Sequence, residues 1–191
     1  MIVIQSIILV AVFLCAISIV WFTVVCGISP MPTSSRVKQV ILELLKRYES
    51  GYRIHELGSG WGTLTSSISG AFPDAQITGY ERSPVPFLCS VVVNKLFRRN
   101  NCRLKFKDFF GASCAEADTV VCYLCPGIMR RLKPKLENEL RRGSLVVSST
   151  FAVPGWQPIE TVALNDLYHT KVYVYRKNEG GTSHPDPNFR H

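Results

Sequence analysis

The residues with the clearest chemical potential form a glycine-rich turn preceded by an acid. The segment from Glu56 to Gly62 has the sequence Glu-Leu-Gly-Ser-Gly-Trp-Gly, so glycine recurs at every second position after the acid. Glycines in such a turn permit positive φ angles and let a ligand approach the backbone closely. A dinucleotide fingerprint would need a third glycine where Thr63 stands, so that pattern is not met. The spacing therefore indicates a ligand-binding turn of another type.

Two further carboxylates follow the next two β-like runs of the sequence. Glu81 ends the second run and Asp108 ends the third. The carboxyl ends of parallel strands meet at one edge of an open sheet, and ligands bind there. An acid at the end of the second strand is placed to accept both hydroxyls of a ribose. Each acid alone could instead cap a turn or pair with a nearby arginine, but three in this order favour a nucleoside-binding edge.

The elements that must position these acids follow from the apolar periodicity. Short β-type runs occur at residues 52–57, 76–80, 103–106, 119–124 and 145–149. Helical patterns occur at residues 34–49, 63–72, 86–99 and 134–142, and residues 109–118 hold at most a helical turn. Strands that alternate with helices predict an α/β fold with a parallel sheet. Two last β-like runs, at residues 159–164 and 171–176, predict an antiparallel hairpin that closes the sheet.

Charge divides the chain into two parts. Lys and Arg together outnumber Asp and Glu by 22 to 14, yet no charged residue precedes Arg36. Because about 20 apolar residues span a bilayer, residues 1–28 are predicted to be a retained transmembrane anchor. A cleaved signal peptide is less favoured, since no basic region precedes the apolar run. The basic residues after the anchor predict a single-pass membrane protein whose domain, residues 29–177, faces the cytoplasm or an equivalent compartment such as the matrix. Residues 178–191 have no apolar content and are expected to be a disordered tail.

The cysteines and histidines argue against metal or nucleophilic chemistry. The seven cysteines are an odd number, so a disulfide framework is not expected. Cys122 and Cys125 form a CxxC pair, but no second pair and no histidine accompanies it. His55 lies inside the first strand, where a core histidine is the simpler interpretation. No metal site is therefore predicted.

The basic excess is concentrated in two clusters. One consists of Arg98, Arg99, Arg103, Lys105 and Lys107, and the other of Arg130, Arg131, Lys133, Lys135, Arg141 and Arg142. On a domain tethered to a membrane, such clusters are expected to contact anionic lipid headgroups. RNA binding is the competing explanation. The short spacer between the apolar segment and the first helix favours lipid as the partner over nucleic acid.

The glycine turn and the three acids together resemble the class I S-adenosylmethionine-dependent methyltransferases, over about residues 53–176. The resemblance implies a Rossmann-like, mostly parallel seven-stranded sheet with an antiparallel strand, and S-adenosylmethionine as cofactor. It implies roles for the motif residues. Gly58, Ser59, Gly60 and Gly62 would line the methionine and ribose, Glu56 would hold the amino group, Glu81 the ribose hydroxyls, Asp108 the adenine amino group, and Phe109 would contact the adenine ring.

A closer resemblance links the chain to small membrane-associated protein-lysine methyltransferases, which include the enzymes that methylate the c-ring protein of ATP synthase. The motifs that carry it are Pro-Met-Pro-Thr at residues 30–33, Gly-Tyr-Glu-Arg-Ser-Pro at 79–84, Arg-Leu-Lys-Pro-Lys-Leu-Glu at 131–137 and Pro-Gly-Trp at 154–156. The resemblance implies transfer of a methyl group to a protein lysine. Tyr123 is then the candidate for orienting the amine, with Thr33, Pro126 and Trp156 as channel walls.

Three functions remain open on the sequence alone. They are a protein-lysine methyltransferase at the membrane surface, a methyltransferase for a lipid or small molecule, and a cofactor-binding protein without catalysis. Base methylation is disfavoured because Tyr-Leu-Cys-Pro-Gly at residues 123–127 replaces the Asn/Asp-Pro-Pro-Tyr/Phe loop of nucleobase amino methyltransferases. Tyr123 also has a plain structural interpretation, in which it packs on a helix.

Overall fold

A seven-stranded sheet with the order β3-β2-β1-β4-β5-β7-β6 organises the chain in the computed structural model, which describes residues 1–26 and 33–178. The strands are β1 (Arg53–Leu57), β2 (Gln76–Glu81), β3 (Cys102–Phe106), β4 (Thr119–Cys122), β5 (Leu145–Ser149), β6 (Glu160–Ala163) and β7 (Lys171–Arg176). The first five are parallel, and β7 is antiparallel to both β5 and β6. The predicted Rossmann-like sheet and its closing hairpin are thus present.

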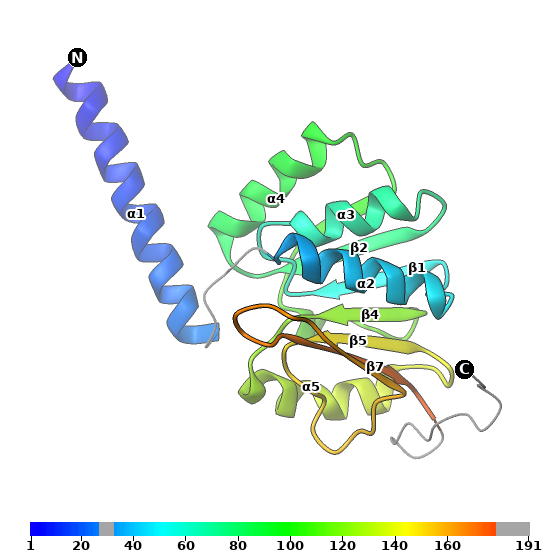
Figure 1. Ribbon diagram of the computed structural model, residues 1–191. Coiled ribbons are helices and arrows are strands. Elements are labelled where there is room, and N and C mark those ends of the chain that lie inside the picture. The colour runs from blue at the N-terminus through cyan, green and yellow to red at the C-terminus, as the bar shows by residue number, and fades with distance from the viewer. Residues whose placement is uncertain (27–32, 179–191) are drawn as a thin grey trace.

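Helices cover the sheet unevenly. They are α1 (Ile2–Cys26), α2 (Ser35–Arg47), α3 (Thr63–Ala71), α4 (Pro84–Leu96) and α5 (Pro126–Glu139), with a single 3-10 turn η1 (Phe109–Gly111). Helices α2, α3 and α4 lie on one face, and α5 lies on the other (Figure 1). Two buried apolar clusters result, one between α2, α3 and the sheet and one between α5 and the sheet. The connection from β3 to β4 holds only η1, as the sequence predicted.

Helix α5 begins earlier than the sequence predicted. The apolar pattern placed the helix at residues 134–142, with Leu132, Leu136 and Leu140 on one face. In the structure Pro126 occupies the first turn, and Pro134 lies inside the helix. Met129, Leu132 and Leu136 form its buried face. Either proline could stand in the first turn of the helix, and the buried apolar stripe that starts at Met129 shows that Pro126 does.

The N-terminal helix requires a correction. Residues 1–28 were predicted to cross a membrane, and α1 is indeed helical over Ile2–Cys26. A crossing needs about 20 consecutive apolar residues. Among residues 1–26 and 33–178, no helix combines the length and the apolar character that a bilayer crossing requires. The predicted transmembrane helix is therefore wrong. Residues 27–32 and the predicted tail from residue 179 onward lie outside the described residues.

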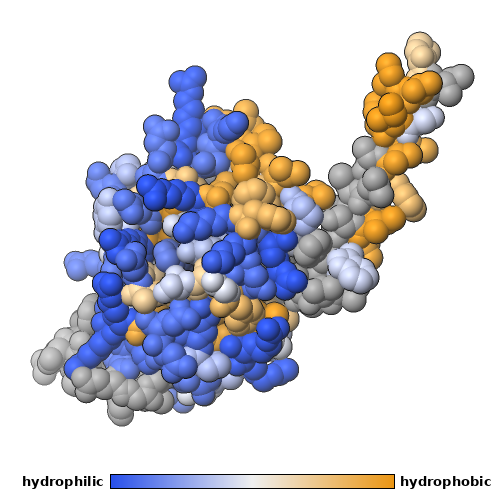
Figure 2. Space-filling view, turned by 180° about the vertical axis from the view of Figure 1, so that it is seen from behind, coloured by the Kyte–Doolittle hydropathy of each residue, from blue (hydrophilic) through white to orange (hydrophobic). Residues whose placement is uncertain are grey.

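The described side chains of α1 nevertheless present an apolar surface next to the body of the fold. Ile4, Ile7, Val10 and Phe13 are all more than half exposed. Helix α1 contacts α4, and apolar side chains also gather on the side of the body that faces α1 (Figure 2). Exposed apolar surface is therefore concentrated on one side of the molecule, whereas most of the face seen in Figure 2 is hydrophilic.

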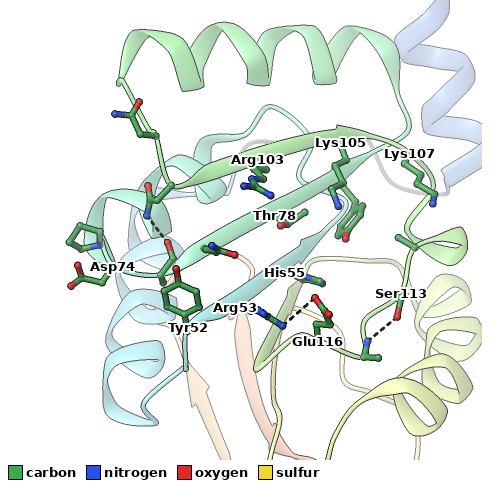
Figure 3. Close-up of a pocket in the computed structure, with 18 residues that line it drawn as sticks. Tyr52, Arg53, His55, Asp74, Thr78, Arg103, Lys105, Lys107, Ser113 and Glu116 are labelled. Carbon is green, nitrogen blue, oxygen red and sulfur yellow. Dashed lines mark hydrogen bonds and ion pairs between the residues drawn. The ribbon is translucent and has the colours of Figure 1, made fainter.

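One face of the sheet is open over β1, β2 and β3. Residues alternate between the two faces of a strand, so Arg53 and His55 on β1 share a face with Thr78 on β2 and with Arg103 and Lys105 on β3. The parallel register places His55, Thr78 and Arg103 in one row. Figure 3 shows these side chains on the sheet face away from α4. The short β3–β4 connection leaves this face uncovered by any helix among the described residues.

Candidate functional site

The glycine-rich turn joins β1 to α3 at the carboxyl edge of the sheet. The backbone N–H groups of Gly58 and Ser59 both donate to the carbonyl of Tyr80, at 3.0 and 2.9 Å, so the turn is fixed to the end of β2. Gly58, Gly60 and Gly62 have φ angles of +78°, +52° and +73°. These values are strained for any residue with a Cβ atom. The motif is therefore glycine-rich because the backbone requires it.

Glu81 ties the turn to the start of α4. One carboxylate oxygen accepts the Gly60 N–H at 2.8 Å, and the other accepts the Ser83 N–H at 2.7 Å. Each carboxylate oxygen can accept two hydrogen bonds. Each oxygen therefore keeps acceptor capacity for a ligand hydroxyl, as the predicted ribose role of Glu81 requires. The side chain is 8% exposed, so its position is well defined by packing.

Glu56 lies beneath the turn and is almost fully buried. Thr65 on α3 donates a hydrogen bond to its carboxylate. Burial raises the pKa of Glu56 to about 8, and the nearby Glu81 charge adds to this shift while the bond from Thr65 opposes it. A cation placed beside Glu56 would lower this pKa again. The protonation state of the Glu56 carboxyl group therefore depends on the charge of the group that it contacts.

Asp108 and Phe109 occupy the end of β3. Asp108 caps η1 by accepting the Phe110 N–H at 3.0 Å, and it pairs with Arg82 at 3.3 Å. Its half-exposed carboxylate is at the predicted edge. Phe109 is buried, 4.7 Å from the Phe110 ring between centroids. Its position in the α5 cluster supports the η1 turn from below.

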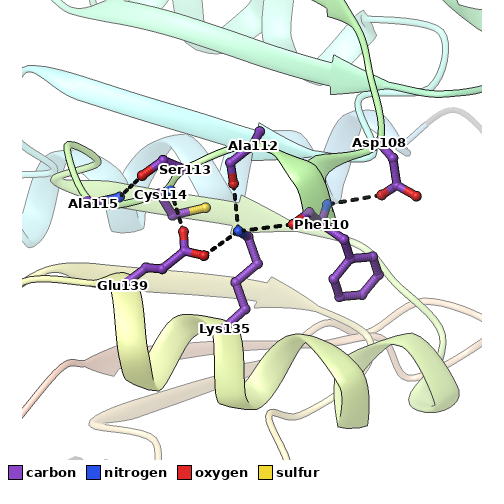
Figure 4. A network of polar contacts seen from close by, with 8 residues as sticks. All are labelled: Asp108, Phe110, Ala112, Ser113, Cys114, Ala115, Lys135 and Glu139. Atoms are coloured by element: carbon purple, nitrogen blue, oxygen red, sulfur yellow. Dashed lines mark hydrogen bonds and ion pairs between the residues drawn. The ribbon is translucent and has the colours of Figure 1, made fainter.

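A polar network fastens the η1 segment to α5 (Figure 4). The Lys135 ammonium donates to the Ala112 carbonyl at 2.6 Å, to the Phe110 carbonyl at 3.4 Å and to Glu139 at 2.6 Å. Glu139 in turn accepts the Cys114 N–H at 2.7 Å. Burial alone would raise the pKa of Glu139, but the bonds from Lys135 and Cys114 hold it below its usual value. Lys135 is thus a structural residue, and its predicted contact with lipid headgroups is not supported.

The second basic cluster is also engaged elsewhere along α5. Lys133 lies 3.8 Å from Glu137, and the Arg131 guanidinium lies over the Phe110 ring at 4.6 Å from its centroid. Intramolecular partners therefore account for much of this cluster. Arg103, Lys105 and Lys107 of the first cluster line the open sheet face instead.

The residues proposed for the acceptor side are spread over three places. Tyr123 directly follows β4 and stacks on Phe151, with the ring centroids 6.4 Å apart and the planes 8° apart. Pro126 is exposed at the first turn of α5, and Thr33 is half-buried before α2. Trp156 is only 4% exposed, donates to Glu137 at 3.1 Å and packs edge-on against Tyr175. Trp156 therefore belongs to the core under α5, and a role in a substrate channel stays a prediction for the others.

The turn has features that fit S-adenosylmethionine. The hydroxyl oxygen of Ser59 is buried and has no hydrogen-bond partner among the described residues, although a buried polar atom normally has one. A Cβ atom built on Gly60 would meet no atom within 4 Å, so space lies above the turn. A nucleoside with an amino acid portion supplies polar groups that can bond the Ser59 hydroxyl and occupy the space above Gly60. When bound, the cofactor supplies a methyl group that is already activated on a sulfonium.

Sequence reasoning missed three residues of this site. Ser83 holds Glu81 through its backbone, Thr65 bonds Glu56, and Lys135 anchors the η1 segment. Only Ser83 carried a usable signal, because a serine directly before a proline is typical of a helix start. Thr65 and Lys135 depend on how α3 and α5 lie on the sheet, which the local sequence does not specify.

Comparisons with known proteins agree with this geometry. Residues 56–160 match the family described as the ANTKMT methyltransferase domain. A protein-lysine N-methyltransferase of Saccharolobus islandicus (strain REY15A) is 30% identical over 150 residues, which cover 76% of this chain and 91% of that protein. The adenine nucleotide translocase lysine N-methyltransferase of Mus musculus is 38% identical over a shorter match of 56 residues, which covers 29% of this chain and 24% of the mouse protein.

A solved structure shows the same fold with a product of the cofactor. The RNA methyltransferase of Salinibacter ruber, in complex with S-adenosyl-L-homocysteine, is 30% identical and superposes with a TM-score of 0.66. The match covers 76% of this chain and 93% of that chain. The methyl donor that the resemblance to class I methyltransferases implied, S-adenosylmethionine, is thus confirmed.

Proposed function

Because the chain belongs to the ANTKMT methyltransferase domain family and is an S-adenosylmethionine-dependent methyltransferase, we propose that its methyl acceptor is a lysine amine of a protein. The relative from Saccharolobus islandicus, which is named a protein-lysine N-methyltransferase, supports this over nearly its whole length. The lipid, small-molecule and RNA alternatives become outcomes of the test.

The observation that carries the proposal is the chain segment after β4. Tyr123, Leu124 and Cys125 follow the strand there, and α5 begins at Pro126. This segment lacks the amide or carboxylate side chain that nucleobase amino methyltransferases use to accept an exocyclic amine. A lysine amine needs no such acceptor, because it must only arrive deprotonated and aligned with the methyl group.

The apolar surroundings favour the neutral amine. A lysine has an ordinary pKa near 10.4, and both removal from water and a neighbouring positive charge lower it. Leu124 lies beside the turn, 3.1 Å from the position that a Cβ atom on Gly58 would take. Tyr123, held by its stack on Phe151, supplies a phenol next to this apolar side chain. These residues can orient the amine and keep water from it.

For the location, we propose contact with a lipid surface through the side of the molecule that carries α1 and α4. Leu88, Val92 and Leu96 on α4 are 63%, 56% and 74% exposed, and Phe97 beside them is 59% exposed. Lys95 and Arg98 adjoin them in sequence and are exposed as well. Apolar side chains rimmed by cations match the boundary between acyl chains and anionic headgroups. An acceptor lysine on a membrane protein would then be within reach.

The acceptor is tested by transfer of label from tritiated S-adenosylmethionine into cell extracts, separated into protein, RNA, lipid and small molecules. We expect label in protein, and mass spectrometry should find lysines heavier by one, two or three methyl groups. The Glu81→Ala variant serves as the inactive control and Glu43→Ala, on the outer side of α2, as the matched active one. Label found in RNA, lipid or small molecules and absent from protein would refute the lysine acceptor.

The lipid contact is tested separately by sedimentation with vesicles. The wild type should sediment with vesicles of phosphatidylcholine and phosphatidylglycerol, and a Leu88→Ser/Val92→Ser double variant should sediment less. Leu167→Ser/Tyr168→Ser, at two exposed positions between β6 and β7, is the matched control. Equal sedimentation of the α4 variant and the wild type would refute the role of α4 and leave the acceptor proposal untouched.

A further inference from the structure

The open face of the sheet forms a concave site that the methyl-transfer function does not use. A cavity of about 760 Å³ lies over β1, β2 and β3. This volume is in the range of small-molecule sites in proteins. None of the glycines of the turn, Glu56, Glu81 or Asp108 lines it. By strand alternation Glu56 and Glu81 point to the opposite face, so the cavity is separate from the cofactor site.

The charge of this cavity is strongly positive. Arg53, Arg103, Lys105 and Lys107 line it, whereas Asp74 and Glu116 are the acids in its lining. Glu116 is paired with Arg53 at 3.2 Å. No ion pair is formed by Arg103, Lys105 or Lys107 within the described part of the chain. Arg103 and Lys105 on β3 are two residues apart, which is about 6.6 Å along a strand, and Lys107 follows the end of the strand. These three cations line the cavity without an anionic partner, and the Lys105 ammonium lies over the Tyr80 ring, 5.5 Å from its centroid.

His55 provides a second and independent observation. Its side chain lies in the floor of the cavity, is 8% exposed and packs edge-on against Tyr80 with ring centroids 5.5 Å apart. The Nδ1 atom is buried and has no hydrogen-bond partner within residues 1–26 and 33–178. Burial, followed by the charge of Lys105, lowers the pKa of His55. A neutral imidazole nitrogen that lacks a partner in this way is unusual in a folded protein.

A protective role for the cations does not explain all of these features. Charged side chains on an edge strand such as β3 discourage pairing with other molecules. That role accounts for Arg103 and Lys105. It accounts neither for the concave shape nor for the unsatisfied nitrogen of His55. Guanidinium and ammonium groups around a polar floor match the geometry of phosphate oxygens.

We propose that this open face binds a ligand with two neighbouring phosphate groups, held by Arg103 and Lys105 above His55 and Thr78 (Figure 3). The phosphates belong either to a free phosphorylated small molecule or to the headgroup of a phospholipid. A volume of about 760 Å³ suits a compact anion. The site does not depend on the identity of the methyl acceptor, because it shares no residue with the cofactor edge.

Calorimetric titration with sodium diphosphate tests the free ligand, and sedimentation with phosphatidylcholine vesicles that contain cardiolipin, whose headgroup carries two phosphates, tests the headgroup. We expect the Arg103→Gln/Lys105→Gln variant to bind diphosphate about 10- to 100-fold more weakly. His55→Phe, which keeps the ring packing, should weaken binding about three- to tenfold. Binding of S-adenosylhomocysteine should stay at the wild-type level in both variants, which shows that they are folded and that the two sites are separate.

The matched control is Lys46→Gln/Arg141→Gln, which removes the same charge from exposed positions outside the cavity. It should bind diphosphate like the wild type. Binding of diphosphate alone identifies a free ligand, and vesicle binding that Arg103→Gln/Lys105→Gln abolishes identifies a headgroup. Three results would overturn the proposal: no binding in either assay, equal losses in the control variant, or binding of polyglutamate or single-stranded RNA at least as tight as that of diphosphate.

Discussion

Replacing Glu81 by alanine should weaken the binding of the cofactor while the fold persists. The Glu81 carboxylate holds the Gly60 and Ser83 N–H groups at 2.8 and 2.7 Å, and each of its oxygens retains acceptor capacity for one ribose hydroxyl. A hydrogen bond contributes a net of about 1 to 1.5 kcal/mol. Loss of two such bonds, about 2 to 3 kcal/mol, corresponds to a dissociation constant about 30 to 150 times larger.

Glutamine at position 81 gives the sharper comparison. It has the size of glutamate but only one acceptor oxygen, and its NH2 group would face either the Gly60 or the Ser83 N–H. Glu81→Gln should therefore bind the cofactor nearly as weakly as Glu81→Ala. Calorimetry with S-adenosylhomocysteine measures both, with Glu43→Ala as the control and circular dichroism to check folding. Affinities within about threefold of the wild type in both folded variants would show that Glu81 does not hold the ribose.

Three other changes test the site from different sides. Burial raises the pKa of Glu56 to about 8, so the folded state keeps a proton that the unfolded state releases above about pH 4.5. The free energy of unfolding should therefore fall as pH rises from 4.5 to 8. Glu56→Gln should flatten this slope in urea titrations. Gly62→Ala would place a Cβ atom 2.6 Å from Ser90 Cβ and should lower the melting temperature. Gly60→Ala meets no atom within 4 Å, so it should lower stability by only about 1 kcal/mol while weakening cofactor binding. Equal melting temperatures of the two variants would contradict this expectation. Lys135→Met removes the bonds to the η1 segment and should cost about 2 kcal/mol of unfolding free energy in chemical denaturation, together with faster hydrogen exchange in residues 109–115.

The sequence predicted the sheet well because its strands are apolar runs bounded by turns. The runs at residues 76–80 and 145–149 correspond to β2 and β5 within one residue. The glycine turn was equally visible, since its positive φ angles leave few alternatives to glycine. Strands and turns of this kind are determined by neighbouring residues, so they can be predicted without the tertiary structure.

What the sequence did not reveal depends on packing between distant segments. Lys135 has the appearance of a surface cation on an amphipathic helix, yet its ammonium is committed to carbonyl groups more than twenty residues away. Trp156 belongs to a motif of the lysine methyltransferases, yet it is buried against Tyr175. The open sheet face had a readable signal, because Arg103 and Lys105 alternate with other residues along β3 and Lys107 continues this alternation beyond the strand. The cavity itself depends on the absence of a covering helix among the described residues and on the β3–β4 connection, whose residues Ser113 and Glu116 line it.

The place of β7 in the sheet has a consequence for how the protein is made. Strand β7 lies between β5 and β6, so the outer backbone groups of β5 pair only with the last strand of the described chain. During synthesis, the outer edge of β5 stays unpaired until the ribosome has released Arg176. By then every other strand except β6 already has a partner available. The nascent domain is therefore exposed to edge-to-edge aggregation until β7 has emerged. A stop codon before Lys171 would leave β5 and β6 without a neighbour on this side, and would damage a protein whose whole cofactor edge had already been synthesised.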